Sequence, residues 1–304
     1  MTETSATLTP RPVGQRSPIA RIVGDFSRSW IAMIGLAGLI CVALIAIFAP
    51  WLAPQNPYDL SQIDILDNML PPGEKSFSGT TYLLGTDQQG RDLLSAILYG
   101  LRISLLVGLS SAVFAVLIGA TLGLLAAYIG GRFETFIMRL VDLQLSFPSI
   151  LVALMILAFI GRGVGNVILA LIIVEWATYA RTARGSALSE IKKEYIEAAE
   201  ALSIPVWRMV FRHLLPNCLP PLLVIATVQI ARAITLEATL SFLGLGVPVT
   251  EPSLGMLISN GYQYMMSGKQ WVSLYPGVAL LFTIVSINLV GDRLRDVMNP
   301  RNQR

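Results

Sequence analysis

The stretch ISLLVGLSSAVFAVLIGATLGLLAAYIGG, residues 103–131, contains no charged side chain. A helix needs about 20 mainly apolar residues to cross the hydrocarbon core of a bilayer, and this stretch is longer than that. Hydrocarbon offers no hydrogen-bonding partner to a peptide group, whereas a helix pairs all of its own. The stretch therefore predicts a membrane-spanning helix.

Five more apolar runs accompany this stretch: 30–49, 143–161, 163–180, 214–250 and 270–291. The fourth of the six spans contains one charge, Glu175, and the fifth contains Arg232 and Glu237. Charged residues make up 13% of the chain, about half the share in typical soluble domains. The sequence therefore predicts an all-α polytopic membrane protein with six transmembrane helices.

Lysine and arginine residues predict the orientation. If the first span starts on the inside, the outside segments hold only Lys75, Arg91, Arg102, Arg162 and Lys269. Arg232 lies within a span, and all the rest of the 22 Lys and Arg residues lie inside. Positive residues favour the cytoplasmic side of a membrane. We therefore expect both termini to be cytoplasmic.

The polar segments divide the chain further. Residues 1–29 predict a loosely ordered cytoplasmic tail, and 30–52 is a first helix that prolines should end. The polar tail is longer than the start of a typical signal peptide, and the apolar run 30–49 is longer than a signal's apolar region. We therefore expect this helix to be kept as a membrane anchor rather than cleaved off. Residues 53–101 contain many Pro and Gly residues and predict an outside loop with little regular structure. A second outside segment covers 248–273, and 293–304 is a cytoplasmic tail.

The most polar inside stretch is TARGSALSEIKKEYIEAAEALSIPVWRMVFRHLLP, residues 182–216. Its apolar residues recur at helical spacing, at Ala187, Ile191, Tyr195, Ala198 and Leu202. Pro205 should interrupt this helix, and Ser203 is placed to cap a second short helix that returns to the membrane. On spacing alone, a solvated hairpin and a docking element for a partner protein both fit.

Glu197-Ala198-Ala199, followed by His213-Leu214-Leu215-Pro216, resembles the EAA signature of permease subunits in binding-protein-dependent ABC importers. Ser203 stands where that signature usually has glycine. The resemblance implies that the loop forms a coupling helix, which docks into a cleft of a cytoplasmic ATPase. It implies ATPase contacts for Glu197, Ala198, Ala199 and Ser203 and bracing roles for Arg208 and His213. Leu202, Ile204 and Pro205 complete the candidate coupling residues.

Other motifs extend the resemblance over roughly residues 30–301. Leu84-Gly85-Thr86-Asp87 with Gly90-Arg91-Asp92, EATLSFLGLG at 237–246 and Gly291-Asp292 are similar to motifs of dipeptide and oligopeptide permeases. Pro300-Arg301 is similar too, although Asn299 replaces the usual Asp. The chain resembles the C-type subunit of the peptide/nickel importer family. This implies a type I ABC importer permease fold, with its transmembrane domain at 102–292, in the bacterial cytoplasmic membrane.

The resemblance also implies partners. A second, homologous permease subunit would form a heterodimer that encloses the path. Two cytoplasmic ATP-binding subunits would hydrolyse ATP with Mg²⁺, and an extracytoplasmic binding protein would deliver the substrate. Di- or oligopeptides are the expected substrates, while nickel and glutathione import remain open within the same family.

The chain lacks residues for catalysis of its own. A phosphate-binding loop needs Gly-x-x-x-x-Gly-Lys-[Ser/Thr], and the one Gly-Lys pair, at 268–269, is not followed by Ser or Thr. His213 is the only histidine, and neither Cys41 nor Cys218 has a partner at metal-type spacing. We expect no catalytic residue, no metal or cofactor in this chain, and no nucleic-acid partner.

Glu175, Arg232 and Glu237 are candidates for the translocation path, since ionisable residues within a membrane usually face a cavity or one another. Arg232 falls near mid-depth, where it could bind a peptide carboxylate or pair with either acid. Glu237 belongs to a family motif, which favours a structural role. An ion-coupled secondary transporter would use such charges as a proton relay. The polar residues concentrate in the inside loop instead, which favours the ABC permease.

Overall fold

The computed structural model describes residues 18–298, apart from residues 60, 62, 77–78 and 249. The first part of the expected N-terminal tail and the 299–301 motif lie outside the described residues. The regular structure within the described residues is helical, except for two isolated β-bridges in the 53–92 segment. The predicted all-α class is confirmed.

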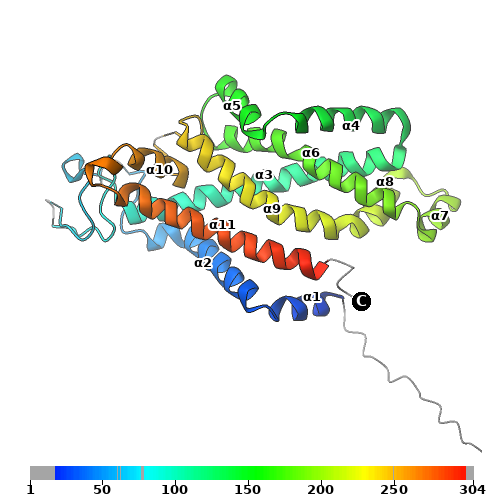
Figure 1. Cartoon of the computed structure of the whole chain (residues 1–304), viewed down its shortest axis with the longest axis horizontal. Coiled ribbons are helices and arrows are strands. Elements are labelled where there is room, and N and C mark those ends of the chain that lie inside the picture. The colour runs from blue at the N-terminus through cyan, green and yellow to red at the C-terminus, as the bar shows by residue number, and fades with distance from the viewer. Residues whose placement is uncertain (1–17, 60, 62, 77–78, 249, 299–304) are drawn as a thin grey trace, which may run out of the picture.

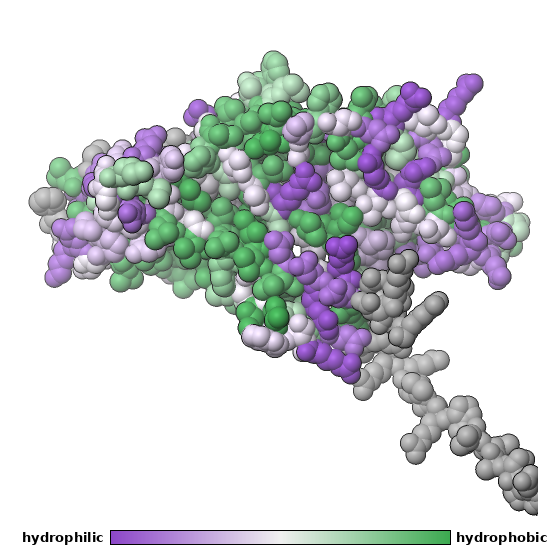
Figure 2. Space-filling model, in the orientation of Figure 1, coloured by the Kyte–Doolittle hydropathy of each residue, from purple (hydrophilic) through white to green (hydrophobic). Residues whose placement is uncertain are grey.

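Five helices of the described residues are long and apolar enough to cross a membrane. They are α2 (Trp30–Leu52), α3 (Leu93–Ile129), α6 (Val164–Glu190), α9 (Leu215–Phe242, extended backward to Val206 by short turns) and α11 (Trp271–Met298). Figure 1 shows them running roughly along the long axis, with α7 (Glu194–Ala201) at one end and α10 (Leu254–Tyr262) at the other. In Figure 2 hydrophobic residues cover the middle, and hydrophilic residues gather toward both ends. We call these the α7 end and the α10 end.

The third span predicted over 143–161 is not one continuous helix. The chain there forms α4 (Gly131–Ser146) and α5 (Ser149–Ile160), which meet at an angle of 92°. Pro148 causes the break, because proline cannot donate a helical hydrogen bond and keeps the preceding Phe147 extended. The bent pair makes a sixth span only if its two halves are counted together.

The helix bounds also differ from the hydropathy limits. α3 begins at Leu93, inside the segment expected to be loop, because Asp92 caps it by accepting a hydrogen bond from the Ser95 amide (2.8 Å). α6 and α11 run beyond the predicted spans into charged sequence, and α9 ends eight residues early, before Gly244 with its φ of +78°. Hydropathy marks the part of a helix that hydrocarbon surrounds, and the helices continue past it.

The expected loose tail contains a helix, α1 (Pro18–Ser27). Pro18 suits a first helical position because its missing N–H has no helical partner there. The Arg293 guanidinium of α11 donates to the Asp25 carbonyl oxygen, and Ser29 accepts from the Ala32 amide to cap α2. These contacts tie α1 to the bundle, so the prediction is corrected for residues 18–27.

α3 lies at the centre and crosses α6 at very short range. Gly119 and Gly123 of α3 face the α6 backbone, and a Cβ on either glycine would lie 2.3 Å from a carbonyl oxygen, of Trp176 or Ala180 respectively. Small residues spaced four apart allow such close packing of membrane helices. This crossing fixes the position of α6, which leads directly to the α7 end.

Residues 53–92, which we call the cap, fold over the α10 end. The described residues of the cap include a turn of 3₁₀-helix (Ile65–Asp67) and two isolated bridges. Arg91 Nη2 and Asp87 Oδ2 form an ion pair at 2.6 Å, and both side chains are 1% exposed. Asp87 also accepts from the amides of Gln89 (2.8 Å) and Arg91 (3.1 Å). This buried pair organises a segment that has little regular structure.

Candidate functional site

The segment from the end of α6 at Glu190 through α7 to α8 (Val206–Arg208) turns back toward the bundle, and we call it the α7 hairpin. The Lys193 ammonium donates to Glu190 Oε1 (2.7 Å), and the Tyr195 hydroxyl donates to Glu190 Oε2 (2.9 Å). Burial and this hydrogen bond raise the pKa of Tyr195 to about 12. The Tyr195 hydroxyl therefore stays protonated near neutral pH and holds the turn between the two helices.

One face of α7 packs onto the bundle. Ile196 is fully buried and Ala199 is 6% exposed, and both join a core that includes Met209 and Leu214. Ala199, for which an ATPase contact is predicted, therefore has its methyl group toward this core. The turn after Glu190 restarts the helix in a new phase, so the exposed face differs from the periodic pattern in the sequence.

The other face of the hairpin carries exposed apolar side chains, which we call the crest: Ala198, Leu202, Val206 and Trp207. Leu202 is 77% exposed and Trp207 is 61% exposed, at the more highly charged end of the molecule. The Arg208 guanidinium carbon lies 5.4 Å from the centre of the Trp207 ring. Such apolar groups with a polar rim mark interaction surfaces. Sequence reasoning missed Val206 and Trp207, although a tryptophan in a polar loop was a visible signal.

The remaining predicted coupling residues surround the crest. Glu197, Ser203, Pro205 and Arg208 are exposed, and Ile204 is half-buried. His213 is half-buried in a π-helix (Met209–Leu214) between α8 (Val206–Arg208) and α9. The His213 carbonyl accepts a hydrogen bond from the side-chain amide of Asn217 (2.7 Å). A π-helix leaves the regular ladder of hydrogen bonds and often occurs at functional sites.

Ser203 was predicted to cap the second short helix, α8, but it lies at the end of α7 instead. Pro205 takes the position before α8. Ser203 has a φ of +54°, and its amide donates to the Glu200 carbonyl (2.8 Å). The Ile204 amide donates to the Ala199 carbonyl (3.3 Å). This pair of bonds is the Schellman ending of a helix, in which the left-handed position usually holds glycine. The geometry explains why the signature usually has glycine at this position, and Ser203 adopts the same backbone conformation.

Changing Ser203 tests this turn. Valine should weaken the hairpin by about 1–2 kcal/mol, because a β-branched side chain strongly disfavours positive φ, whereas glycine should leave it as stable or more so. Limited proteolysis of the 191–205 segment in the folded protein measures the difference. Equal cleavage rates for Ser203→Val and Ser203→Gly would contradict the assigned backbone geometry.

A cavity of about 180 Å³ lies between the α4–α5 break, α6 and α9. Glu175 and Arg232 both line it, together with Ser149, Thr178 and Gln229. The Arg232 guanidinium is exposed and donates to the Ser149 hydroxyl (2.7 Å), whereas Glu175 is 2% exposed. The structure therefore brings two of the three predicted intramembrane charges to one cavity.

Glu237 lies elsewhere. It is fully buried between α3 and α9, where it accepts hydrogen bonds from the hydroxyls of Ser104 (3.2 Å) and Ser241 (2.8 Å). It does not line the cavity that holds Glu175 and Arg232. Its carboxylate joins two helices, which is a structural arrangement.

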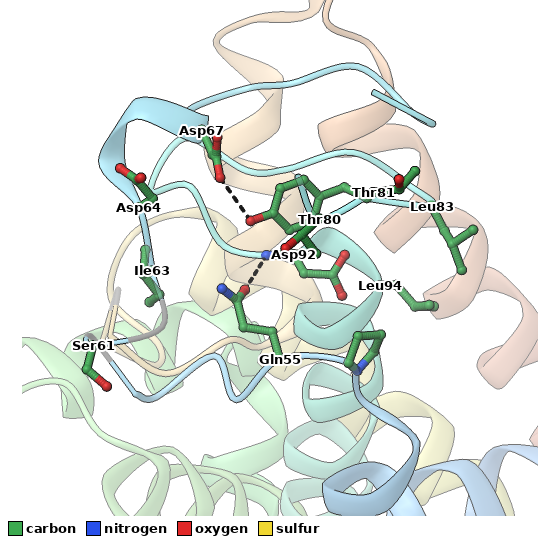
Figure 3. A pocket seen from close by; sticks show the side chains of 12 residues that line it. Gln55, Ser61, Ile63, Asp64, Asp67, Thr80, Thr81, Leu83, Asp92 and Leu94 are labelled. Carbon is green, nitrogen blue, oxygen red and sulfur yellow. Dashed lines mark hydrogen bonds between the residues drawn. The ribbon is translucent and has the colours of Figure 1, made fainter. Parts of the chain in front are cut away.

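A larger cavity, of about 510 Å³, lies in the cap (Figure 3). Its carboxylates already have partners: Asp67 accepts from the Tyr82 hydroxyl (3.1 Å), and Asp92 caps α3. The Asp92 amide donates to Gln55 Oε1 (2.7 Å). Burial and Asp67 raise the pKa of Tyr82 to about 12, so its hydroxyl stays a donor. These groups hold the cap together.

Comparison with known proteins places the chain. Residues 119–304 match the family described as binding-protein-dependent transport system inner membrane component, and residues 17–72 match the N-terminal TM domain of oligopeptide transport permease C. The chain belongs to this family of inner membrane components. The family resemblance inferred from the EAA signature is confirmed. This inner membrane component is a multi-pass transport protein rather than an enzyme, and its systems include a binding protein and separate ATPase subunits.

Relatives of this inner membrane component match over nearly their whole length. It is 38% identical to the di/tripeptide transport system permease protein DppC of Pseudomonas aeruginosa, over 94% of this chain and 93% of that protein. It is also 38% identical to the dipeptide transport system permease protein DppC of Escherichia coli K12, over 99% of this chain and 98% of that protein.

A solved inward-facing structure of the MetNI methionine ABC transporter has a chain of the same fold. The TM-score is 0.55 at 23% identity, over 68% of this chain and 98% of that chain.

Proposed function

We propose that this chain is the C-type permease subunit of an ABC importer that carries di- and oligopeptides across the inner membrane. The observation that carries the assignment is the match, from end to end, to permeases named for dipeptide and di/tripeptide transport. The transmembrane domain begins with α3 and ends with α11, and the cap and α2 precede or flank it.

The α7 hairpin is the element that docks on an ATPase subunit. Its crest offers Leu202 and Trp207 as apolar anchors, and Glu197 and Arg208 supply a charged rim. Its inner face packs into the core through Ile196. A force applied to the crest therefore reaches α6 and α9 without a flexible linker. Arg208 and His213 support this hairpin at its return to α9.

The α7 end faces the cytoplasm in this proposal. Arg132, Arg184, Lys192, Arg208 and Arg212 lie in or beside the turns at that end. The segments at the α10 end carry few positive residues, as the positive-inside rule requires of an external face. Both termini then lie on the cytoplasmic side. The C-terminal end of α2 leads into the cap and the N-terminal end of α11 follows α10, so the opposite end of each helix lies toward the cytoplasm.

A second, homologous permease subunit covers the face that bears Arg232. Arg232 lies ten residues before the end of α9, which is about 15 Å along a helix and half the thickness of the hydrocarbon core. An exposed guanidinium at that depth would be costly in lipid. A partner subunit with the translocation path between the two explains how the charge is accommodated.

Transport by the reconstituted system tests the function. Proteoliposomes containing this chain, the second permease, the ATPases and the binding protein should take up a radiolabelled dipeptide when ATP is supplied. Uptake should stop when ATP is replaced by a non-hydrolysable analogue. Uptake of nickel or glutathione in place of the peptide would overturn the peptide assignment.

Crosslinking tests the docking surface separately. A cysteine at Ala198 or Ser203 should form a crosslink to an ATPase subunit, in a background where the exposed Cys41 is serine. Cysteine at Met266 is the matched control, since Met266 is fully exposed beside α10. Equal crosslinking from both ends, or from Met266 alone, would reject the proposed orientation and docking.

A further inference from the structure

The cavity between α5, α6 and α9 contains buried polar groups without partners. Glu175 is 2% exposed, and neither of its carboxyl oxygens has a hydrogen-bond partner. Gln229 is 4% exposed, and its amide nitrogen is also unpaired. Buried polar groups in proteins are nearly always hydrogen-bonded, and an unpaired carboxylate is among the costliest exceptions. The cavity is therefore built around groups that await a ligand or water.

We propose that Glu175 binds the free N-terminal ammonium group of the peptide in transit, while Gln229 and Arg232 donate to its carbonyl or carboxylate oxygens. The proposal rests on the peptide importer function above. A primary ammonium supplies three N–H donors and one positive charge, which match two unpaired carboxyl oxygens. Amide and guanidinium donors beside them suit the oxygens that follow an N-terminus.

The arrangement of charge favours an ammonium over other ligands. Glu175 is deep, whereas Arg232 is exposed at the rim. Their charges cancel, as do the two terminal charges of a peptide, so the bound peptide as a whole adds no net charge to the membrane interior. No group of three or more His, Cys, Asp or Glu side chains within the described part of the chain could hold a metal ion. Hard cations prefer six or more oxygen ligands, and this cavity offers one carboxylate.

The size of the cavity limits how much of a peptide it can bind. A volume of about 180 Å³ equals roughly six water molecules at about 30 Å³ each. One or two residues fill that space, and an extended dipeptide is about 7 Å long. The cavity thus takes one end of a peptide rather than the whole chain. A site that binds the end is indifferent to peptide length and to most side chains.

The direct test compares two ligands on the assembled permease–ATPase complex, without the binding protein. Alanyl-alanine should bind about 10- to 100-fold more tightly than N-formyl-alanyl-alanine, the range for loss of a charge-assisted hydrogen bond. Isothermal titration calorimetry measures both affinities. Equal affinities in the unmodified complex would overturn the proposal and leave a cavity that holds only water.

Glu175→Gln should abolish this preference while the complex still assembles, which size-exclusion chromatography measures. Thr178→Val, in the same cavity, is the matched control and should keep the preference. A preference that survives Glu175→Gln would overturn the proposal. The comparison of ligands decides the question even if the variant does not assemble. Failure of peptide uptake by the unmodified importer would instead reject the proposed function.

Discussion

Replacing Gly119 by valine is expected to abolish accumulation of the folded protein in the membrane. A Cβ at Gly119 would lie 2.3 Å from the Trp176 carbonyl oxygen and 2.7 Å from the Tyr179 Cβ. Neither neighbour is the end of a flexible side chain, so α3 and α6 must separate. Overpacking of this kind costs about 3 kcal/mol or more, a large share of a typical stability of about 5–15 kcal/mol.

Gly277 of α11 provides the control, since a Cβ there meets no atom within 4 Å. Gly277→Val changes composition and helix propensity in the same way without a clash. Size-exclusion chromatography and thermal unfolding in detergent measure the outcome. Similar yields and midpoints for the two variants would show that the α3–α6 crossing is looser than described.

Asp87→Leu is expected to unfold the cap. The Arg91 guanidinium and the Asp87 carboxylate are both 1% exposed, and breaking a buried ion pair by removing one partner costs about 3–5 kcal/mol. Protease should then cleave within residues 53–92, where the native protein resists. Peptide uptake that depends on the binding protein should fall, while basal ATP hydrolysis remains, because the cap lies opposite the α7 end.

The double variant Asp87→Leu with Arg91→Met separates charge from packing. Replacing both members of a buried pair by apolar residues is often nearly neutral, so the double variant should regain much of the protease resistance. Asp87 also accepts two backbone hydrogen bonds, so recovery should be incomplete. A double variant as sensitive as Asp87→Leu would mean that those backbone bonds, rather than the ion pair, hold the cap.

Much of the fold could be predicted because hydropathy reports directly on the membrane. The uncharged run at 103–131 and the first helix at 30–52 appear in the structure as parts of α3 and as α2. Two misses had readable signals. Pro148 within an apolar run warned of the α4–α5 break, and Gly119 and Gly123 form the spacing typical of close helix crossings.

The rest required tertiary structure. The α7 hairpin was predicted to expose Ala199, but the turn after Glu190 sets a new helical phase, and only packing of Ile196 shows which face is inside. Glu175 and Arg232 lie 57 positions apart on different helices, so no local pattern could place them in one cavity. The apolar residues of α1 recur at helical spacing, at Ile19, Ile22, Val23 and Phe26. The prolines before them nevertheless suggested a loose tail.

α6 is one unbroken helix from Val164 to Glu190, about 40 Å long, and it carries Glu175 near its middle. α9 enters through a π-helix and contains Pro220 and Pro221, which cannot donate ladder hydrogen bonds. α6 is therefore expected to be the stiffer helix and α9 the more easily bent one, and both connect to the α7 hairpin. If the hairpin is the docking element proposed above, a displacement of the hairpin moves Glu175 together with the whole of α6, whereas Arg232 lies on a helix that can bend. The distance between these two side chains is then expected to change during transport.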